Sequence, residues 1–237
     1  MSLLRPLLLA CLLGLNLNAT AQNDVQLPDS SAIQQNLDSL ADRKLPEAEQ
    51  QAMQKVLEDT LKNIEGIAQA NQDIVDLQKQ LKTAPQVIKA AKKELLDLAA
   101  LPATPDLKKY ENYTPEQLET VLNERRTALT EAQQALSDAN SIYINAQSRP
   151  ERAQTDINAM LQRGQQIEAA LTSGKLDGRP ITKELRTQLQ SELQLLQANA
   201  ELLKQQMAAN DVLLDLGTVL REVATLRSGF LDKEMLG

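Results

Sequence analysis

Apolar residues recur every three or four positions along most of the chain, with polar residues between them. One stripe consists of Met53, Leu57, Leu61, Ile64, Ile67, Ile74, Leu77 and Leu81. A second stripe repeats every seven residues at Leu122, Leu129, Leu136, Tyr143, Pro150, Ile157, Gly164 and Leu171. A spacing near 3.6 residues places such positions on one face of an α-helix. The pattern predicts long amphipathic helices with coiled-coil-like packing.

Two prolines interrupt these stripes in similar contexts, Thr83-Ala84-Pro85-Gln86 and Ser148-Arg149-Pro150-Glu151. A proline inside a helix removes a backbone hydrogen bond and costs about 3 kcal/mol. Ser or Thr before the proline and Glu or Gln after it suit the first turn of a new helix. We therefore predict two helical-hairpin corners, formed by Thr83, Pro85, Gln86, Ser148, Pro150 and Glu151. A kink in a continuous helix is the alternative.

A reversal at Pro150 would bring residues equidistant from that corner together. The predicted seam pairs are Tyr143 with Ile157, Leu136 with Gly164, and Leu129 with Leu171. A seven-residue lattice is symmetric about its own points, so the repeat itself fits either a hairpin or a straight helix. On the neighbouring column Ala146 would meet Ala153, Ala139 would meet Met160 and Ala132 would meet Ile167; several pairs set a small residue against a large one, which suits close antiparallel packing.

Capping and turn residues set the other boundaries. Thr114-Pro115-Glu116-Gln117 has a capping-box pattern, and Gly174 and Gly178 predict a loop before a last helix from about Thr182 to Arg227. The predicted order is a signal peptide at 1–21, a linker at 22–30, hairpin regions at 31–105 and 106–178, and a long C-terminal helix region at 179–237. Whether residues 213–235 pack back on the rest stays open at this point.

Composition agrees with an all-α fold of elongated antiparallel hairpins. Aromatic residues make up 2% of the 237 residues and Trp is absent. Leu and Ala supply the apolar positions, with few of the β-branched and aromatic side chains that favour sheets.

The first 21 residues have the features of an export signal. Arg5 precedes an apolar run from Leu7 to Leu17, and Ala19-Thr20-Ala21 fits a cleavage site. Leu8-Leu9-Ala10-Cys11 faintly resembles a lipid-attachment motif, which leaves a lipoprotein as a second interpretation. Cleavage after Ala21 would leave 24 basic and 32 acidic residues, with neither Cys nor His. We therefore expect a periplasmic location in a Gram-negative bacterium.

The residues expected after cleavage offer little for catalysis. Without Cys or His there is no thiolate or imidazole nucleophile, base or metal ligand, and no Gly-rich phosphate loop is present. Carboxylate pairs such as Asp211 and Asp215 suit solvated helix faces. The acidic surface argues against nucleic acid as a partner. We expect no catalytic, cofactor or metal site and no small-molecule substrate.

Four other residues stand out. Asn210 lies on a predicted core column, where a polar side chain can fix register or oligomeric state; an exposed position is the alternative. Arg125 is expected to be an edge residue whose stem packs on the core. Tyr110 and Tyr113 lie in a Pro-flanked loop, where they either support the next helix or contact a partner.

Two segments carry a family resemblance: "TAPQVIKAAKKEL" at the first proline and "LETVLNERRTALTEAQQALSDA" followed by "QSRPERAQ". Together with the export signal they resemble the N-terminal periplasmic region of large mechanosensitive channels. The potassium-regulated type (MscK/KefA) of the small-conductance superfamily is the most similar. The similarity extends from about Ala32 to Arg227.

The resemblance implies a non-enzymatic periplasmic domain of a tension-gated channel that protects against hypoosmotic shock. Its partners would be the remainder of the channel at the inner membrane and neighbouring subunits of a heptamer, and envelope proteins as further candidates. The C-terminal helix would continue into a pore-forming part that this chain lacks. No pore residue of the family can be carried over to a position here. The alternative function is a stand-alone periplasmic adaptor that binds an envelope protein.

Overall fold

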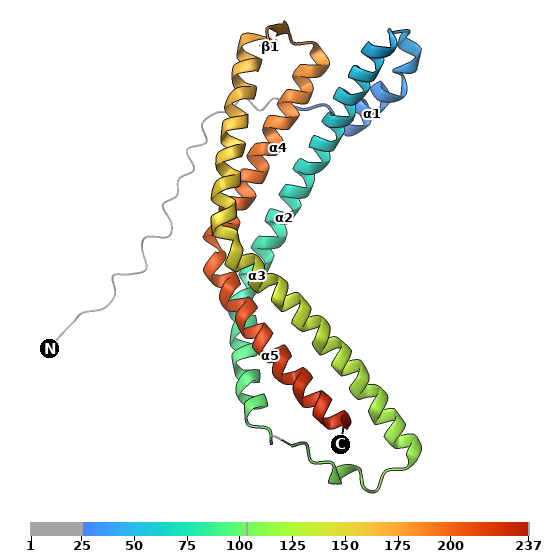
Figure 1. The fold of residues 1–237 in the computed structure, drawn as a ribbon, viewed down its shortest axis with the longest axis vertical. Helices are drawn as coiled ribbons and strands as arrows, with labels where there is room; N and C mark the ends of the chain where they lie inside the picture. Colours follow the sequence, from blue (N-terminus) through green and yellow to red (C-terminus); the bar gives the residue numbers. More distant parts are fainter. Residues whose placement is uncertain (1–25, 103, 237) are drawn as a thin grey trace, which may run out of the picture.

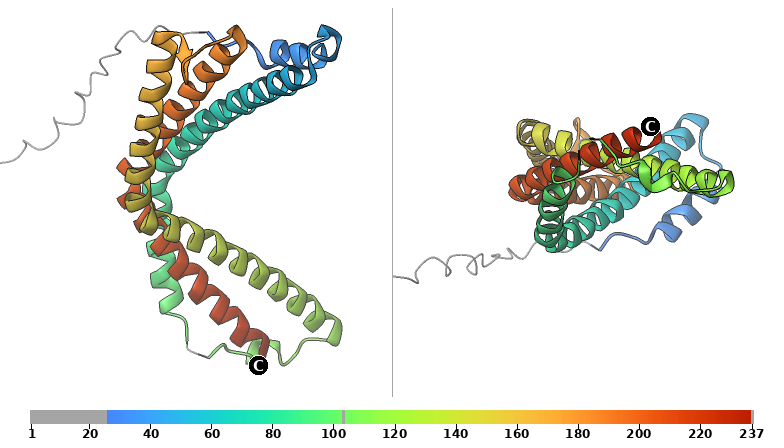
Figure 2. Two further views of the ribbon diagram at one scale, coloured as in Figure 1. Left: turned by 45° about the horizontal axis from the view of Figure 1, so that its top comes forward. Right: turned by 90° about the horizontal axis from the view of Figure 1, so that it is seen from below.

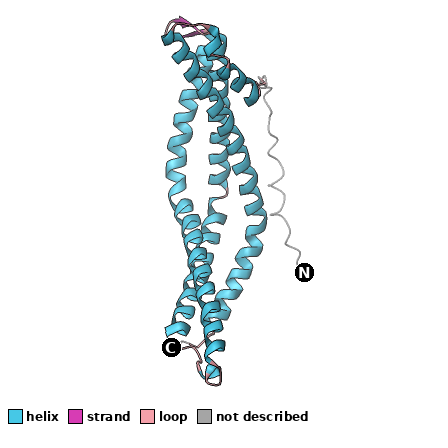
Figure 3. Ribbon diagram, turned by 90° about the vertical axis from the view of Figure 1, so that its right-hand side faces the viewer, coloured by secondary structure: helices cyan, strands magenta, loops and turns pink. Residues whose placement is uncertain are grey.

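The computed structural model describes residues 26–102 and 104–236, nearly all of them helical (Figure 3). Their five α-helices are α1 (Ser30–Asp38), α2 (Glu47–Ala99), α3 (Pro115–Ser173), α4 (Lys183–Ala208) and α5 (Asn210–Leu236). Two 3-10 turns, η1 (Ala41–Arg43) and η2 (Lys108–Tyr110), precede α2 and α3. Strands β1 (Lys175–Leu176) and β2 (Arg179–Pro180) form a small antiparallel turn between α3 and α4. The all-α prediction is confirmed.

The helices α4 and α5 lie in succession between the longer helices α2 and α3 (Figure 1), and the molecule bends where α4 meets α5 (Figure 2). α2 runs parallel to α4 and α5, as successive contacts from Asn63 to Ser191 and from Gln78 to Gln205 show. α3 runs antiparallel to both, since Arg125 and Tyr143 in its first half contact α5 and Arg163 in its second half contacts α4. The C-terminal part of α5 therefore packs back on the chain.

Local sequence signals fix several helix ends. The Thr114 side chain accepts a hydrogen bond from the Gln117 backbone N–H at 3.3 Å, and Gln117 Oε1 accepts one from the Thr114 N–H at 2.8 Å. This is the predicted capping box, with Pro115 in the first turn. The Thr182 side chain caps α4 by accepting a hydrogen bond from the Leu185 N–H at 3.2 Å, without the reciprocal bond of a capping box. Gly174, with φ +68°, ends α3 in the left-handed conformation that glycine tolerates best.

Small side chains form much of the core. On α3, Ala132, Ala139, Ala146 and Ala153 are buried at seven-residue spacing. Alanine at a contact face lets two helices approach closely, at the cost of little buried apolar area per residue. The core is therefore long and thin.

The prediction of helical-hairpin corners at Pro85 and Pro150 is wrong. α2 continues through Pro85 and α3 continues through Pro150, so regions 31–105 and 106–178 each contain one long helix in place of a hairpin. The expected cap residues bond backwards within their helices. Ser148 Oγ donates to the Ile144 carbonyl at 3.0 Å, and Thr83 Oγ1 donates to the Lys79 carbonyl at 3.2 Å.

Continuous packing explains why the helices do not break. A break at Pro150 would separate Ala146 from Ala153, which are both buried on one face of α3. Both prolines are exposed, so neither ring disturbs the core. The local cost of about 3 kcal/mol is thus accommodated. α3 instead changes direction near its middle, visibly so in Figure 1 and in the left view of Figure 2.

The predicted last helix is also divided. α4 ends at Ala208 and α5 begins at Asn210, although Ala209 N–H still donates to the Gln205 carbonyl at 3.0 Å. The chain reverses its direction between α1 and α2, between α2 and α3, and at the β1–β2 turn. The predicted signal peptide, residues 1–21, lies outside the described residues.

Candidate functional site

The candidate sites are contacts between helices. Among the residues that the structure describes, no group of three or more His, Cys, Asp or Glu side chains is arranged to hold a metal ion. Across the same residues, every helix falls short of the length and apolarity that a membrane span requires. Three contact regions, at the middle and toward the two ends, hold the long helices together.

The middle region, which we call the waist, is where α2, α3 and the α4–α5 junction meet. Leu77, Ala146, Ala209 and Leu213 form one buried cluster there. One α-helical turn further along α5, Gly217 packs directly on the backbone of α3. A Cβ atom at Gly217 would lie 2.7 Å from Tyr143 N and 2.9 Å from its Cα. The Arg221 guanidinium covers the Tyr143 ring at 4.1 Å and adds a cation–π contact.

Two polar groups near the waist have no hydrogen-bond partner among the described residues. They are Nη1 of Arg149 and Oδ1 of Asn210, both buried atoms. Burial lowers the pKa of Arg149 from its usual value, because no described acidic group compensates the loss of water. Arg149 shares a polar groove with Asp73 and Asp76 without an ion pair to either. Asn210 itself is half-buried.

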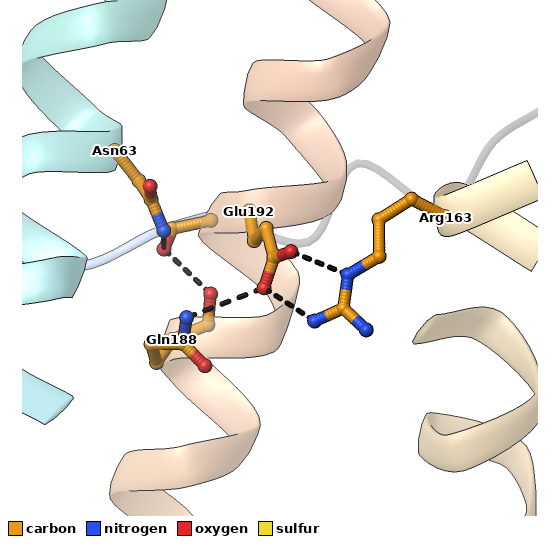
Figure 4. Close-up of polar contacts among 5 residues, drawn as sticks. Asn63, Arg163, Gln188 and Glu192 are labelled. Carbon is orange, nitrogen blue, oxygen red and sulfur yellow. Dashed lines mark hydrogen bonds and ion pairs between the residues drawn. The ribbon is translucent and has the colours of Figure 1, made fainter. Parts of the chain in front are cut away.

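A polar network joins α2, α4 and α3 in the upper half of the molecule, above the waist in Figure 1. We call it the Ser191–Glu192 network (Figure 4). Asn63 Nδ2 donates to Ser191 Oγ at 3.0 Å, and Ser191 Oγ donates to the Gln188 carbonyl at 2.8 Å. On the other side of α4, Arg163 binds Glu192 through two parallel hydrogen bonds of 2.7 and 3.1 Å. Hydrogen bonding to Glu192 raises the pKa of Arg163. This network fixes the register of three helices at one level.

A buried carboxylate binds the end of α5 to the α2–α3 loop and to α3. Glu234 Oε1 accepts hydrogen bonds from Lys109 Nζ at 2.7 Å and from Tyr110 Oη at 2.8 Å. Its other oxygen lies 2.9 Å from Arg125 Nε. The Glu234 side chain is only 3% exposed. We call this group, Lys109, Tyr110, Arg125 and Glu234, the C-terminal clasp.

Opposing influences set the ionisation of the clasp. Burial by itself raises the pKa of Glu234, but the hydrogen bonds from Lys109 and Tyr110 and the charge of Arg125 outweigh it, so the pKa lies below its ordinary value. The hydrogen bond to Glu234 raises the pKa of Lys109. The clasp therefore holds a carboxylate ion and two cations at neutral pH.

The predicted seam residues do not pair with one another as expected. α3 packs on α4 and α5, so Tyr143 contacts Gly217, and Gly164 faces Leu193. Leu129, Leu136 and Leu171 are half-buried, and Ile157 is buried. The six residues therefore lie along one continuous helix.

The clasp was not among the sites predicted from the sequence. Arg125 is more than an edge residue because it faces Glu234, and Tyr110 supports α5 as well as the loop. Tyr113 packs edge-to-face on Tyr110, with ring centres 5.4 Å apart. A signal did exist: extending the column of Gly217 and Ala224 by seven reaches Leu231, and Glu234 lies three residues later, at a core position.

Comparison with known proteins gives the chain a family. Residues 36–236 match the mechanosensitive ion channel porin domain. The chain is 26% identical over 218 residues to a protein of Escherichia coli (strain K12) named mechanosensitive channel MscK. That similarity covers 92% of this chain and 20% of the relative, so the chain spans about a fifth of the relative's length. No solved structure matches the chain. Because the family match covers most of its length, the chain belongs to the mechanosensitive ion channel porin domain family.

Proposed function

We propose that this chain is the periplasmic helical domain of an MscK-type mechanosensitive channel that protects cells from hypoosmotic shock. The family match over residues 36–236 is the observation that carries the proposal. The family is a channel-domain family and is not an enzyme family. In this proposal the pore-forming membrane part lies outside the chain, and the domain is attached to the inner membrane through it.

The structure supports a mechanical role. α2 and α3 contain 53 and 59 residues, which corresponds to about 80 and 90 Å of helix at 1.5 Å per residue. Such helices can carry a displacement over a long distance only if their register is fixed. The waist, the Ser191–Glu192 network and the C-terminal clasp provide three such fixed points.

The proposed partners are the remainder of the channel and neighbouring subunits, in a heptamer as the family resemblance implies. We propose no enzymatic activity, cofactor, small-molecule substrate or nucleic acid for the domain. A formal net charge of −7 supports the last point, because phosphate backbones attract basic surfaces. A periplasmic location follows from the same proposal and from the export signal expected at residues 1–21.

A chimeric channel tests the proposal. The segment of E. coli MscK that matches this chain is replaced by residues 36–236, and the chimera is expressed in cells without other mechanosensitive channels. We expect cells that express the chimera to survive osmotic downshock, and the chimera to give tension-gated currents in patch-clamp recordings. The control is MscK from which the matching segment has been deleted. A chimera that reaches the membrane but behaves like an unrelated helical insert would contradict the proposal.

The reading frame of the gene distinguishes a channel subunit from a stand-alone periplasmic adaptor, which is the alternative function. If a natural stop codon directly follows the codon for Gly237, and the exported chain is recovered with an envelope protein, the chain is a free adaptor and the channel-subunit proposal is wrong. If the reading frame continues into membrane-spanning segments, the adaptor alternative is wrong.

A further inference from the structure

The outer face of the lower half of α2, which is its C-terminal half below the waist in Figure 1, carries a stripe of lysines. The stripe follows the alternating spacing of four and three residues that is typical of a coiled-coil seam. Its members, all exposed, are Val75, Lys79, Lys82, Gln86, Lys89, Lys93 and Leu96. We call it the basic stripe. The opposite face of the same segment is buried, through Leu77, Ala84 and Ala91.

Three features distinguish the basic stripe from an ordinary solvated face. Residues 77–93 contain no acidic side chain, although the whole chain carries a net charge of −7. Among the described residues, Lys82, Lys89 and Lys93 have no ion-pair partner. The stripe also ends in two exposed apolar side chains, Val75 at 44% and Leu96 at 73% exposure. A row of unpaired charge of one sign can select a partner that carries a complementary row and can fix its register.

A complementary stripe lies on the outer face of the lower half of α3. It has the same alternating spacing and consists of exposed residues only: Glu124, Thr127, Glu131, Gln134, Asp138, Ser141 and Asn145. We call it the acidic stripe. Residues 127–148 contain no Lys or Arg. Neither Glu124 nor Glu131 has an ion-pair partner among the described residues.

The two stripes belong to helices on opposite sides of α5. Figure 1 and the left view of Figure 2 show the lower half of α2 on one side of α5 and that of α3 on the other. A surface and its complement on opposite sides of a molecule favour head-to-tail association, in which every copy uses both. A surface that pairs with itself would give only two-fold contacts.

The directions of the helices agree with such an arrangement. α2 and α3 run antiparallel within one chain. Copies related by rotation about an axis along the molecule keep the same orientation, so α2 of one copy would run antiparallel to α3 of the next. Lys82 and Lys89 are seven residues apart, as are Asp138 and Glu131. Antiparallel pairing of Lys82 with Asp138 then also pairs Lys89 with Glu131.

We propose that copies of this chain associate side by side, with the basic stripe of one copy on the acidic stripe of the next. Exposed ion pairs contribute little individually and are screened by salt. The charges therefore select the neighbour and the register, and the apolar ends of the basic stripe add contact area. The inference rests on the proposed function, which already includes neighbouring subunits as partners, and deepens it by naming the two surfaces that meet; it does not depend on a pore.

Cross-linking of isotopically mixed protein tests the contact directly. The full chain is prepared with natural nitrogen and with ¹⁵N, the two are mixed, and a zero-length carbodiimide joins Lys to Asp or Glu side chains in contact. We expect hybrid light–heavy peptides that join Lys82 to Asp138 and Lys89 to Glu131, and fewer of them as salt is added. Hybrid peptides can arise only between copies.

Charge-reversal variants decide whether the stripes cause the association. K82E/K89E is expected to reduce the yield of hybrid peptides and the association constant, measured by light scattering, about ten-fold. Adding E131K/D138K to K82E/K89E is expected to restore both. K55E/K62E is the matched control, because Lys55 and Lys62 are exposed and also seven residues apart on the upper half of α2.

Three outcomes would overturn the proposal. One is a chain that stays monomeric and gives no hybrid peptide. Another is an association that K82E/K89E and K55E/K62E weaken equally. The third is a monomer that binds vesicles of anionic lipid through Lys82 and Lys89, which would make the basic stripe a membrane contact. A channel chimera without activity would leave these results unaffected.

Discussion

At the scale of single residues, the close approach of α3 and α5 depends on Gly217. Its Cα packs on the backbone of Tyr143, and a Cβ atom there would meet N and Cα at 2.7 and 2.9 Å. These are backbone atoms, so they cannot rotate away as a side chain could. The lack of a side chain at position 217 therefore sets the distance between α3 and α5 at the waist.

The first prediction is that Gly217→Ala lowers the free energy of unfolding by about 2 kcal/mol, since α3 and α5 must separate. Gly164→Ala is the matched control. Its Cβ would meet only Leu193 Cδ1 at 3.4 Å, and alanine adds up to about 1 kcal/mol of helix propensity. Urea unfolding followed by circular dichroism measures both. Equal effects of the two substitutions would show that the Tyr143 contact does not limit the packing.

The second prediction concerns Glu234 and pH. The ordinary pKa of this carboxyl group is 4.5, and the clasp holds it lower in the folded state. A depressed pKa contributes stability that is complete above the unfolded value and is lost as pH falls through the folded value. We therefore expect the stability supplied by Glu234 to decrease below about pH 4.5. Hydrogen exchange of the last turns of α5 should accelerate over the same range.

The substitution Glu234→Gln separates this effect from those of other carboxylates. It removes the buried charge between Lys109 and Arg125 and is expected to cost about 2 kcal/mol at neutral pH. The difference between the native chain and the variant should shrink as pH falls below 4.5. A difference that is constant with pH would show that Glu234 is not ionised in the folded chain.

At the scale of secondary-structure elements, Pro150 bends α3 without ending it. The proline is exposed, and Ala146 and Ala153 on either side are buried. The third prediction is that Pro150→Ala raises the free energy of unfolding by about 1–3 kcal/mol, because the helix regains a hydrogen bond and better propensity. Thermal unfolding measures this. A loss of stability would mean that the packing at the waist requires the bend.

Much of the element-level structure could be predicted from local signals. The capping box at Thr114, the cap at Thr182 and the stop at Gly174 were each readable because they involve residues within a few positions of one another. The alanine column of α3 was readable from its seven-residue period. Such signals depend on neighbouring side chains and backbone groups, which the sequence states directly.

The partners of each helix could not be predicted in this way. The repeat around Pro150 fits a fold-back and a continuous helix equally well, because its spacing is the same in both directions. The choice depends on α4 and α5, which begin more than 30 residues later and cover the whole length of α3. The division at Ala209 has the same origin, since it lies beside Ala146 in the waist cluster, where α3 changes direction. A role for Asn210 in fixing register stays a prediction.

At the scale of the whole molecule, the waist joins two halves that differ in composition. In the upper half α4 lies between α2 and α3 through the polar Ser191–Glu192 network. In the lower half α5 replaces it, with Ala91, Val219 and Val223 in the core and Glu94 paired with Arg227 at its edge. Both the bend in α3 and the division between α4 and α5 lie at the waist. A relative movement of the two halves would therefore leave the helices on either side intact.

The fourth prediction distinguishes the continuous α3 from a hairpin at Pro150. Spin labels replace the exposed residues Ser137 and Gln165, next to the predicted seam pair, in a Cys11→Ser background. Twenty-eight residues of continuous helix separate the labels by about 40 Å at 1.5 Å per residue, slightly less with the bend. Distances are measured by pulsed electron paramagnetic resonance. Labels at Leu161 and Gln197, which line one groove between α3 and α4, provide the reference for a short distance. If the labels at 137 and 165 gave a distance as short as this reference, α3 would fold back on itself, and α4 and α5 could no longer occupy its buried face.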